Sequence, residues 1–156
     1  MSLIIRAFRT GEETLLRAVF FSSVHDLAKR HYSPEQLAAW APRAYDEAAW
    51  RGLLHRLQPF VVESGGVIAG YADLQPSGYI DHFFVAGAHG GRGVGAALMA
   101  HIHELARQRG SGALFADVSL SAEAFFARHG FTVEVRKTVD VRGHALQHAR
   151  MRCASH

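Results

Sequence analysis

The stretch of sequence that decides the fold is residues 79–96, which read YIDHFFVAGAHGGRGVGA. Its first seven residues are rich in aromatic and β-branched side chains, which is typical of a strand. A helix begins inside the glycine run that follows, because Val94, Leu98 and Ile102 recur at helical spacing. Glycines allow positive φ angles and a close approach of the backbone to a ligand. Since N–H groups at such a helix start converge on an anion, the segment predicts a phosphate or pyrophosphate site.

The spacing of the residues in this loop distinguishes it from other kinds of anion-binding loop. A Walker loop is excluded because it ends in Gly-Lys-Ser/Thr, whereas this loop ends in Gly95-Ala96-Ala97. A dinucleotide-binding fingerprint fits better, since Gly91-x-Gly93-x-x-Ala96 is followed 21 residues later by Asp117. However, only 39 residues remain after Asp117, too few for the further βαβ units of that fold. A glycine-rich turn without a ligand is the remaining alternative.

Outward from this segment, periodicity and turn residues predict alternating strands and helices. Capping residues predict the helix starts: a Thr10 to Glu13 capping box, a second box at Ser33, and Asp46. We expect strands at residues 3–8, 60–63, 67–74, 79–85, 114–118, 131–141 and 144–152. We expect one helix that is opened by the Thr10 to Glu13 capping box and runs to about residue 24, and further helices at residues 34–40, 47–57, 94–109 and 121–129. This order predicts an α+β fold with a mixed sheet.

Composition excludes several classes of protein. The 156 residues leave room for one domain, and a 49% hydrophobic share supplies a core that disordered chains lack. The net charge of +3 is too small and too scattered for a nucleic-acid-binding surface. No apolar run approaches the length of a membrane span, and the first residues do not have the order of a signal peptide. Because the single cysteine, Cys153, cannot form an internal disulfide, we expect a reduced, cytoplasmic location.

The glycine loop and the element order resemble the GNAT-type acyl-CoA-dependent N-acyltransferases. The family pattern is Gln/Arg-x-x-Gly-x-Gly/Ala after a V-shaped parting of two central strands, and here it reads Gly90-x-x-Gly93-x-Gly95. Gly90 replaces the usual Gln or Arg, while the backbone part of the pattern is intact. The resemblance extends over nearly the whole chain, and residues 32–36 with 39–41 resemble a bacterial subgroup. It implies one domain, residues 1–156, whose largely antiparallel central sheet has helices on both faces.

The resemblance also implies acetyl-CoA as co-substrate and no metal. The backbone of the strand before the loop would pair with the pantetheine arm, and the loop amides would hold the pyrophosphate. Arg92 adds a guanidinium that can pair with phosphate oxygens. The expected cofactor-binding residues are Phe83, Phe84, Val85, Gly90, Gly91, Arg92, Gly93, Val94, Gly95, Ala96 and Phe126.

Transfer to an amine needs a base and a group that stabilises the oxyanion, because a protonated amine cannot attack a thioester. The candidate bases lie on the two central strands, and we rank them Asp117, His82, Asp81. A backbone N–H near Val85 would serve the oxyanion. The family commonly has a tyrosine acid where this chain has Phe126. The thiol, with an unperturbed pKa of about 8.5, can then depart largely as the thiolate, so the loss of the tyrosine slows transfer without abolishing it.

The acceptor is not specified by these residues. His31 and Tyr32 lie in the region that lines the acceptor side of the resembled fold, so we expect them to touch substrate. A small amine, an aminoglycoside, an amino acid and a peptide N-terminus all stay open, as does a homodimer. Eleven histidines include no recognised metal-binding spacing. The alternatives to an N-acetyltransferase are a CoA-binding protein with little or no activity and, less favoured, a dinucleotide-binding domain.

Overall fold

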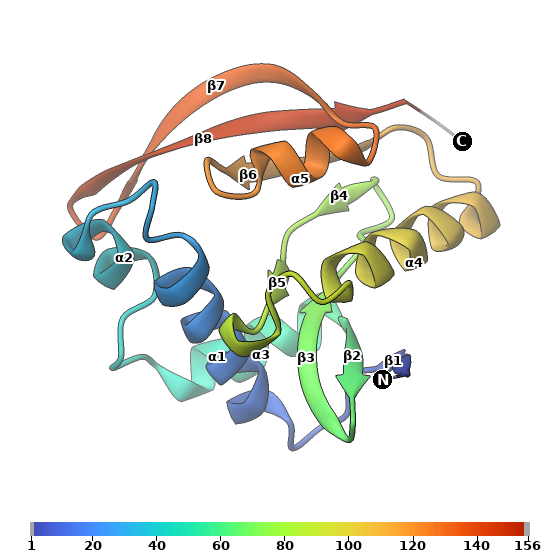
Figure 1. Ribbon diagram of the computed structural model, residues 1–156, viewed down its shortest axis with the longest axis horizontal. Coiled ribbons are helices and arrows are strands. Elements are labelled where there is room, and N and C mark those ends of the chain that lie inside the picture. Colours follow the sequence, from blue (N-terminus) through green and yellow to red (C-terminus); the bar gives the residue numbers. More distant parts are fainter. Residues whose placement is uncertain (1, 155–156) are drawn as a thin grey trace.

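The structure is a computed structural model that describes residues 2–154 (Figure 1). Its strands are β1 Leu3–Ala7, β2 Phe60–Ser64, β3 Val67–Ala72, β4 Tyr79–Ile80, β5 Phe83–Val85, β6 Leu114–Ser119, β7 Thr132–Val141 and β8 His144–Cys153. Its α-helices are α1 Glu13–Ser22, α2 Pro34–Trp40, α3 Glu47–Leu57, α4 Val94–Arg109 and α5 Glu123–Arg128. A π-helical turn, Ser23–Leu27, continues α1, and a 3-10 turn, Gly87–His89, precedes the glycine loop.

The described strands form two four-stranded sheets. The first has the order β1-β2-β3-β5 and is antiparallel throughout. The second has the order β4-β6-β8-β7 and is antiparallel except for the parallel β4–β6 pair. Figure 1 shows the β7–β8 hairpin arching over α5 and reaching α2 at its far end. The predicted mixed, largely antiparallel α+β fold is confirmed, although its sheet is divided in two.

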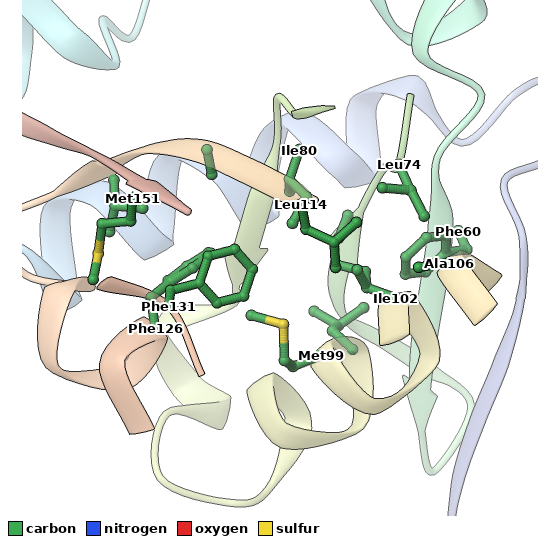
Figure 2. Close-up of a cluster of buried hydrophobic side chains, with 14 of the residues drawn as sticks. Phe60, Leu74, Ile80, Met99, Ile102, Ala106, Leu114, Phe126, Phe131 and Met151 are labelled. Carbon is green, nitrogen blue, oxygen red and sulfur yellow. The ribbon is translucent and has the colours of Figure 1, made fainter. Parts of the chain in front are cut away.

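Helices cover both faces of the first sheet, because side chains alternate along its strands. On β2, Phe60 and Val62 pack against α4, whereas Val61 faces the cluster built by α1 and α3. Figure 2 shows the first of these clusters, in which Met99 and Ile102 of α4 point toward the strands. The cluster around α4 also includes side chains of the second sheet, so one apolar core joins the two sheets.

The predicted strand at residues 79–85 is divided into β4 and β5. β4 pairs with β6, β5 pairs with β3, and Asp81 and His82 lie at the joint between them. The buried carboxylate of Asp73 explains the break. Its Oδ1 accepts the backbone N–H groups of Asp81 at 3.0 Å and His82 at 2.6 Å, which satisfies these donors outside a strand ladder. The prediction of one continuous strand is therefore wrong at its centre.

Two of the three predicted helix caps are confirmed. Ser33 forms the complete capping box with Gln36, and the Asp46 side chain accepts the N–H of Ala49 at 3.0 Å. The Thr10 box is wrong, because α1 begins at Glu13 with no side-chain cap at its first residue. The turn before it is held instead by the carboxylates of two glutamates, Glu12 and Glu13.

Candidate active site

The glycine loop has the geometry expected of an anion site. Gly91 and Gly93 have φ angles of 73° and 84°, in the region that favours glycine, and Gly93 directly precedes α4. Val94, 1% exposed, anchors the first turn of α4 in the core. Because the first N–H groups of a helix lack intrahelical acceptors and lie at its positive end, this turn favours phosphate oxygens. Arg92 is exposed beside it.

The two central strands part in the V shape that the resemblance implies. β5 is the edge of the first sheet, and β6 meets β4 only at Tyr79 and Ile80. A cavity of about 220 Å³, here called the acyl cavity, lies where β5 and β6 diverge. Since no strand of the described chain pairs with the outer edge of β5, its backbone is free to pair with an extended ligand. The acyl cavity is lined by residues that include Phe83, Phe84, Val85, Gly95, Phe125 and Phe126.

Phe126 contributes an apolar wall to the acyl cavity. It is 3% exposed and packs edge-to-face against Phe83 and Phe131, with ring centroids 5.3 Å and 5.1 Å apart. Figure 2 shows Phe126 beside Phe131 at the α5 end of the core. Phe126 therefore closes one side of the acyl cavity, and its phenyl ring has no proton to donate to a leaving group.

A second cavity, of about 450 Å³ and here called the acceptor cavity, opens on the other side of the same joint. Its walls come from α1, α2, α3 and the β7–β8 hairpin. Five residues line both cavities, so a thioester in one and an amine in the other would meet beside them. They are Trp40, Asp81, Phe84, Asp117 and Ser119.

His82 faces the acceptor cavity with one ring nitrogen already engaged. Its Nδ1 lies 3.0 Å from the hydroxyl oxygen of Tyr71, a side chain with no exposed surface. Nε2 is therefore the nitrogen left for a substrate, and it accepts a proton when Nδ1–H donates to Tyr71. Burial lowers the pKa of His82 below its usual value, against the opposing charge of Asp81, so the ring is neutral at pH 7.

The two aspartates at the junction have different surroundings. Asp117 accepts hydrogen bonds from Arg150 Nε at 2.7 Å and from the Tyr79 hydroxyl at 3.3 Å, and Lys137 lies 3.5 Å away. The Arg150 hydrogen bonds hold the pKa of Asp117 below its usual range, which makes it a weaker proton acceptor. Asp81 is exposed and takes part in none of the ion pairs found among residues 2–154.

Sequence reasoning missed Asp73, a fully buried carboxylate that shapes the site. Besides the N–H groups of Asp81 and His82, it accepts a hydrogen bond from the side chain of Gln75. Burial raises the pKa of the Asp73 carboxyl to about 6. Because Asp73 follows an apolar strand, the sequence indicates only an ordinary turn residue at this position. The one sign of its role is that it lies eight residues before Asp81, on the other side of a hairpin.

We expect Asp73→Asn to flatten the dependence of stability on pH. The folded-state pKa of about 6 lies above the unfolded value of about 3.9, so the folded chain binds more protons between these values. The contribution of Asp73 to the free energy of unfolding therefore falls as pH rises from about 4 to 6, by roughly 3 kcal/mol. Denaturant titrations of wild type and variant measure it. Asp140→Asn, which changes an exposed carboxylate on β7, is the control, and equal pH dependence in wild type and Asp73→Asn contradicts the prediction.

The two predicted substrate residues lie in different places. Tyr32 lines the acceptor cavity, but it is 6% exposed and its hydroxyl is fully used, donating to Gln147 O at 2.6 Å and accepting from Leu120 N at 3.0 Å. Tyr32 thus ties the segment before α2 to β8. His31 is exposed and lines neither cavity, and its Nδ1 lies 3.3 Å from Ser121 Oγ.

No group of three or more His, Cys, Asp or Glu side chains among the described residues is arranged to hold a metal ion. None of the described helices is long and apolar enough to cross a membrane.

Known proteins resemble this chain along most of its length. Residues 28–154 match the family model described as an acetyltransferase (GNAT) domain. YafP of Escherichia coli (strain K12), an uncharacterized N-acetyltransferase, is 32% identical over 139 residues, which cover 89% of this chain and 87% of that protein. The crystal structure of a GCN5-related N-acetyltransferase from Rhodopseudomonas palustris superposes with a TM-score of 0.93 at 31% identity, covering 99% and 96% of the two chains. PaiA N-acetyltransferase from Thermoplasma acidophilum, solved in complex with coenzyme A, has the same fold, with a TM-score of 0.77 at 16% identity and 99% coverage of each chain.

Proposed function

The chain belongs to the GNAT family of acetyltransferases, and we propose that it transfers an acetyl group from acetyl-CoA to an amine. The observation that carries the proposal is the meeting of the acyl and acceptor cavities at Asp81 and Asp117, beside the joint of the parted strands. We take residues 1–156 as one domain. We also propose a cytoplasmic location, because a single cysteine suits a reducing compartment.

Acetyl-CoA fits the groups that surround the acyl cavity. Its pyrophosphate suits the N–H groups of residues 91–96 and the Arg92 guanidinium, and its extended pantetheine arm suits the free edge of β5. The Thermoplasma protein, which has the same fold, was solved in complex with coenzyme A, and this supports acetyl-CoA as the ligand. When bound, acetyl-CoA supplies the thioester that the amine attacks. The acyl cavity would hold this thioester, and water is excluded from it by Phe83, Phe125 and Phe126.

We assign the proton transfer to His82. The neutral ring offers Nε2 to the amine, while the exposed carboxylate of Asp81 favours an incoming ammonium group at the same junction. The Asp117 carboxylate is paired with Arg150 and links β6 to β8, so we rank Asp117 below the other two candidate bases. A backbone N–H at the free edge of β5 near Val85 would stabilise the oxyanion.

Binding and turnover test the proposal separately. Acetyl-CoA at a hundred times its Kd should stabilise the fold by about 2.7 kcal/mol in a thermal-shift titration. Release of free thiol should then follow when amines from a broad panel are added. A response to NAD instead of acetyl-CoA would overturn the proposal.

A CoA-binding protein without transferase activity is the second candidate, and Phe126 is the observation that favours it. The buried phenyl ring stands where the family commonly has a tyrosine acid. Tight acetyl-CoA binding with no thiol release from any amine, in both the wild type and Phe126→Tyr, would establish this alternative.

A further inference from the structure

The acceptor cavity contains a cation that the proposed reaction does not use. Arg17, on α1, lines this cavity and takes part in none of the ion pairs found between described residues. One of its terminal nitrogens donates to Pro42 O at 2.9 Å, but its Nε is buried without a hydrogen-bond partner. A buried N–H that has lost water and gained no acceptor is unfavourable, so this group is suited to a ligand that supplies one.

Aromatic rings enclose the Arg17 guanidinium on several sides. Its central carbon lies 4.1 Å from the ring centroid of Tyr45 and 5.0 Å from those of Phe20 and Trp50. The faces of these rings are therefore already occupied by a cation. A second cationic group in this part of the cavity would meet the charge of Arg17 without gaining a free ring face, which disfavours polycationic acceptors such as aminoglycosides.

A second arginine faces the same cavity from the opposite wall. Arg142, at the turn of the β7–β8 hairpin, donates to Ala39 O at 2.7 Å and also has no carboxylate partner among residues 2–154. Each acidic side chain that lines the acceptor cavity either already accepts a hydrogen bond or lies beside the proposed base. Asp46 caps α3, Asp117 pairs with Arg150, and Asp81 lies beside His82.

The cationic and the proton-accepting groups lie near the same pair of rings. The His82 ring centroid lies 6.1 Å from the centroids of both Phe20 and Trp50, the rings that flank Arg17. A ligand beside these rings whose carboxylate and amine are close together can therefore pair with Arg17 and approach His82 at the same time. The other apolar and aromatic side chains that line the acceptor cavity suit an apolar or aromatic side chain on the ligand.

We propose that the acceptor is an amine that also carries a carboxylate, namely an amino acid with an apolar or aromatic side chain. Its carboxylate pairs with the Arg17 guanidinium, and Arg142 adds positive charge. Its amine lies toward His82 and Asp81. This inference rests on the proposed acetyl transfer, and it names the class of acceptor for that reaction.

Matched acceptors and arginine variants test the inference. Phenylalanine and 2-phenylethylamine differ only in the carboxylate, as do tryptophan and tryptamine. For the wild type we expect kcat/KM to be at least tenfold higher for the amino acid of each pair. Arg17→Gln should remove that preference by raising KM for the amino acid about tenfold, with the amine unchanged within twofold. Arg43→Gln is the control, since Arg43 packs on Phe21 at 5.1 Å and lines neither cavity.

The outcomes separate this inference from the proposed function. If the decarboxylated amines are better acceptors, or if Arg17→Gln weakens both members of a pair equally, the carboxylate site is wrong and the transferase stands. If no amine releases thiol, both proposals fail. Acetyl-CoA binding and thermal unfolding report whether Arg17→Gln is folded. If it is not, Arg17→Lys and Arg142→Gln are compared instead, and unchanged amino-acid preference in both overturns the inference.

Discussion

Replacing His82 by glutamine should lower kcat for amine acetylation by about a hundredfold or more, the usual contribution of a positioned general base. The expectation follows from the site geometry, in which Nδ1 is engaged by Tyr71 and Nε2 remains for the acceptor cavity. Glutamine retains a polar group of similar reach but does not take up a proton near neutral pH. Steady-state rates at saturating acetyl-CoA, with any amine that the wild type accepts, measure the effect.

The pH profile gives the same experiment a second readout. Because burial lowers the pKa of His82, the ring loses its proton at a lower pH than an ordinary histidine does, and wild-type kcat should rise with pH through the acidic range before levelling off. The acidic limb should disappear in His82→Gln. His101→Gln is the control, since burial also lowers the pKa of His101 but the residue lines neither cavity. A larger loss in Asp117→Asn than in His82→Gln would move the base to Asp117.

Most features that depend on neighbouring residues were predictable from the sequence, although the Thr10 capping box was not. Gly91 and Gly93 adopt the positive φ angles that the loop requires, and Gly110 ends α4 in the left-handed conformation. The turn at residues 142–143 and the Ser33 capping box likewise follow from side chains within four positions of one another. In each case a glycine permits the required backbone conformation or a nearby side chain caps the helix, so no distant contact is needed.

Features that depend on distant partners were not predictable. Asp117 heads the list of sequence candidates as a carboxylate on a central strand, but Arg150 and Lys137, which lie 33 and 20 residues away, lower its pKa. The joint between β4 and β5 depends on hydrogen bonds to Asp73, and the apolar pattern of residues 79–85 does not indicate this joint. Tyr32 is a polar aromatic residue at a helix start, and its burial results from acceptors and donors on β8 and after β6. The fold was therefore more predictable than the chemistry.

Replacing Gly95 by valine should weaken acetyl-CoA binding by about a hundredfold, because the added methyl groups would take up space that the ligand needs, and a steric conflict of this kind costs about 1–3 kcal/mol. A Cβ atom at this position would lie 3.1 Å and 3.2 Å from two ring atoms of Phe125, and the further methyl groups would enter the acyl cavity between β5 and α5. Calorimetric titration with acetyl-CoA measures the loss. Gly112→Val is the matched control, since a Cβ there meets no atom within 4 Å and the residue lies outside that cavity. If Gly95→Val is folded and binds acetyl-CoA as tightly as the wild type, the ligand does not pass between β5 and β6, and the division into acyl and acceptor cavities would have to be abandoned.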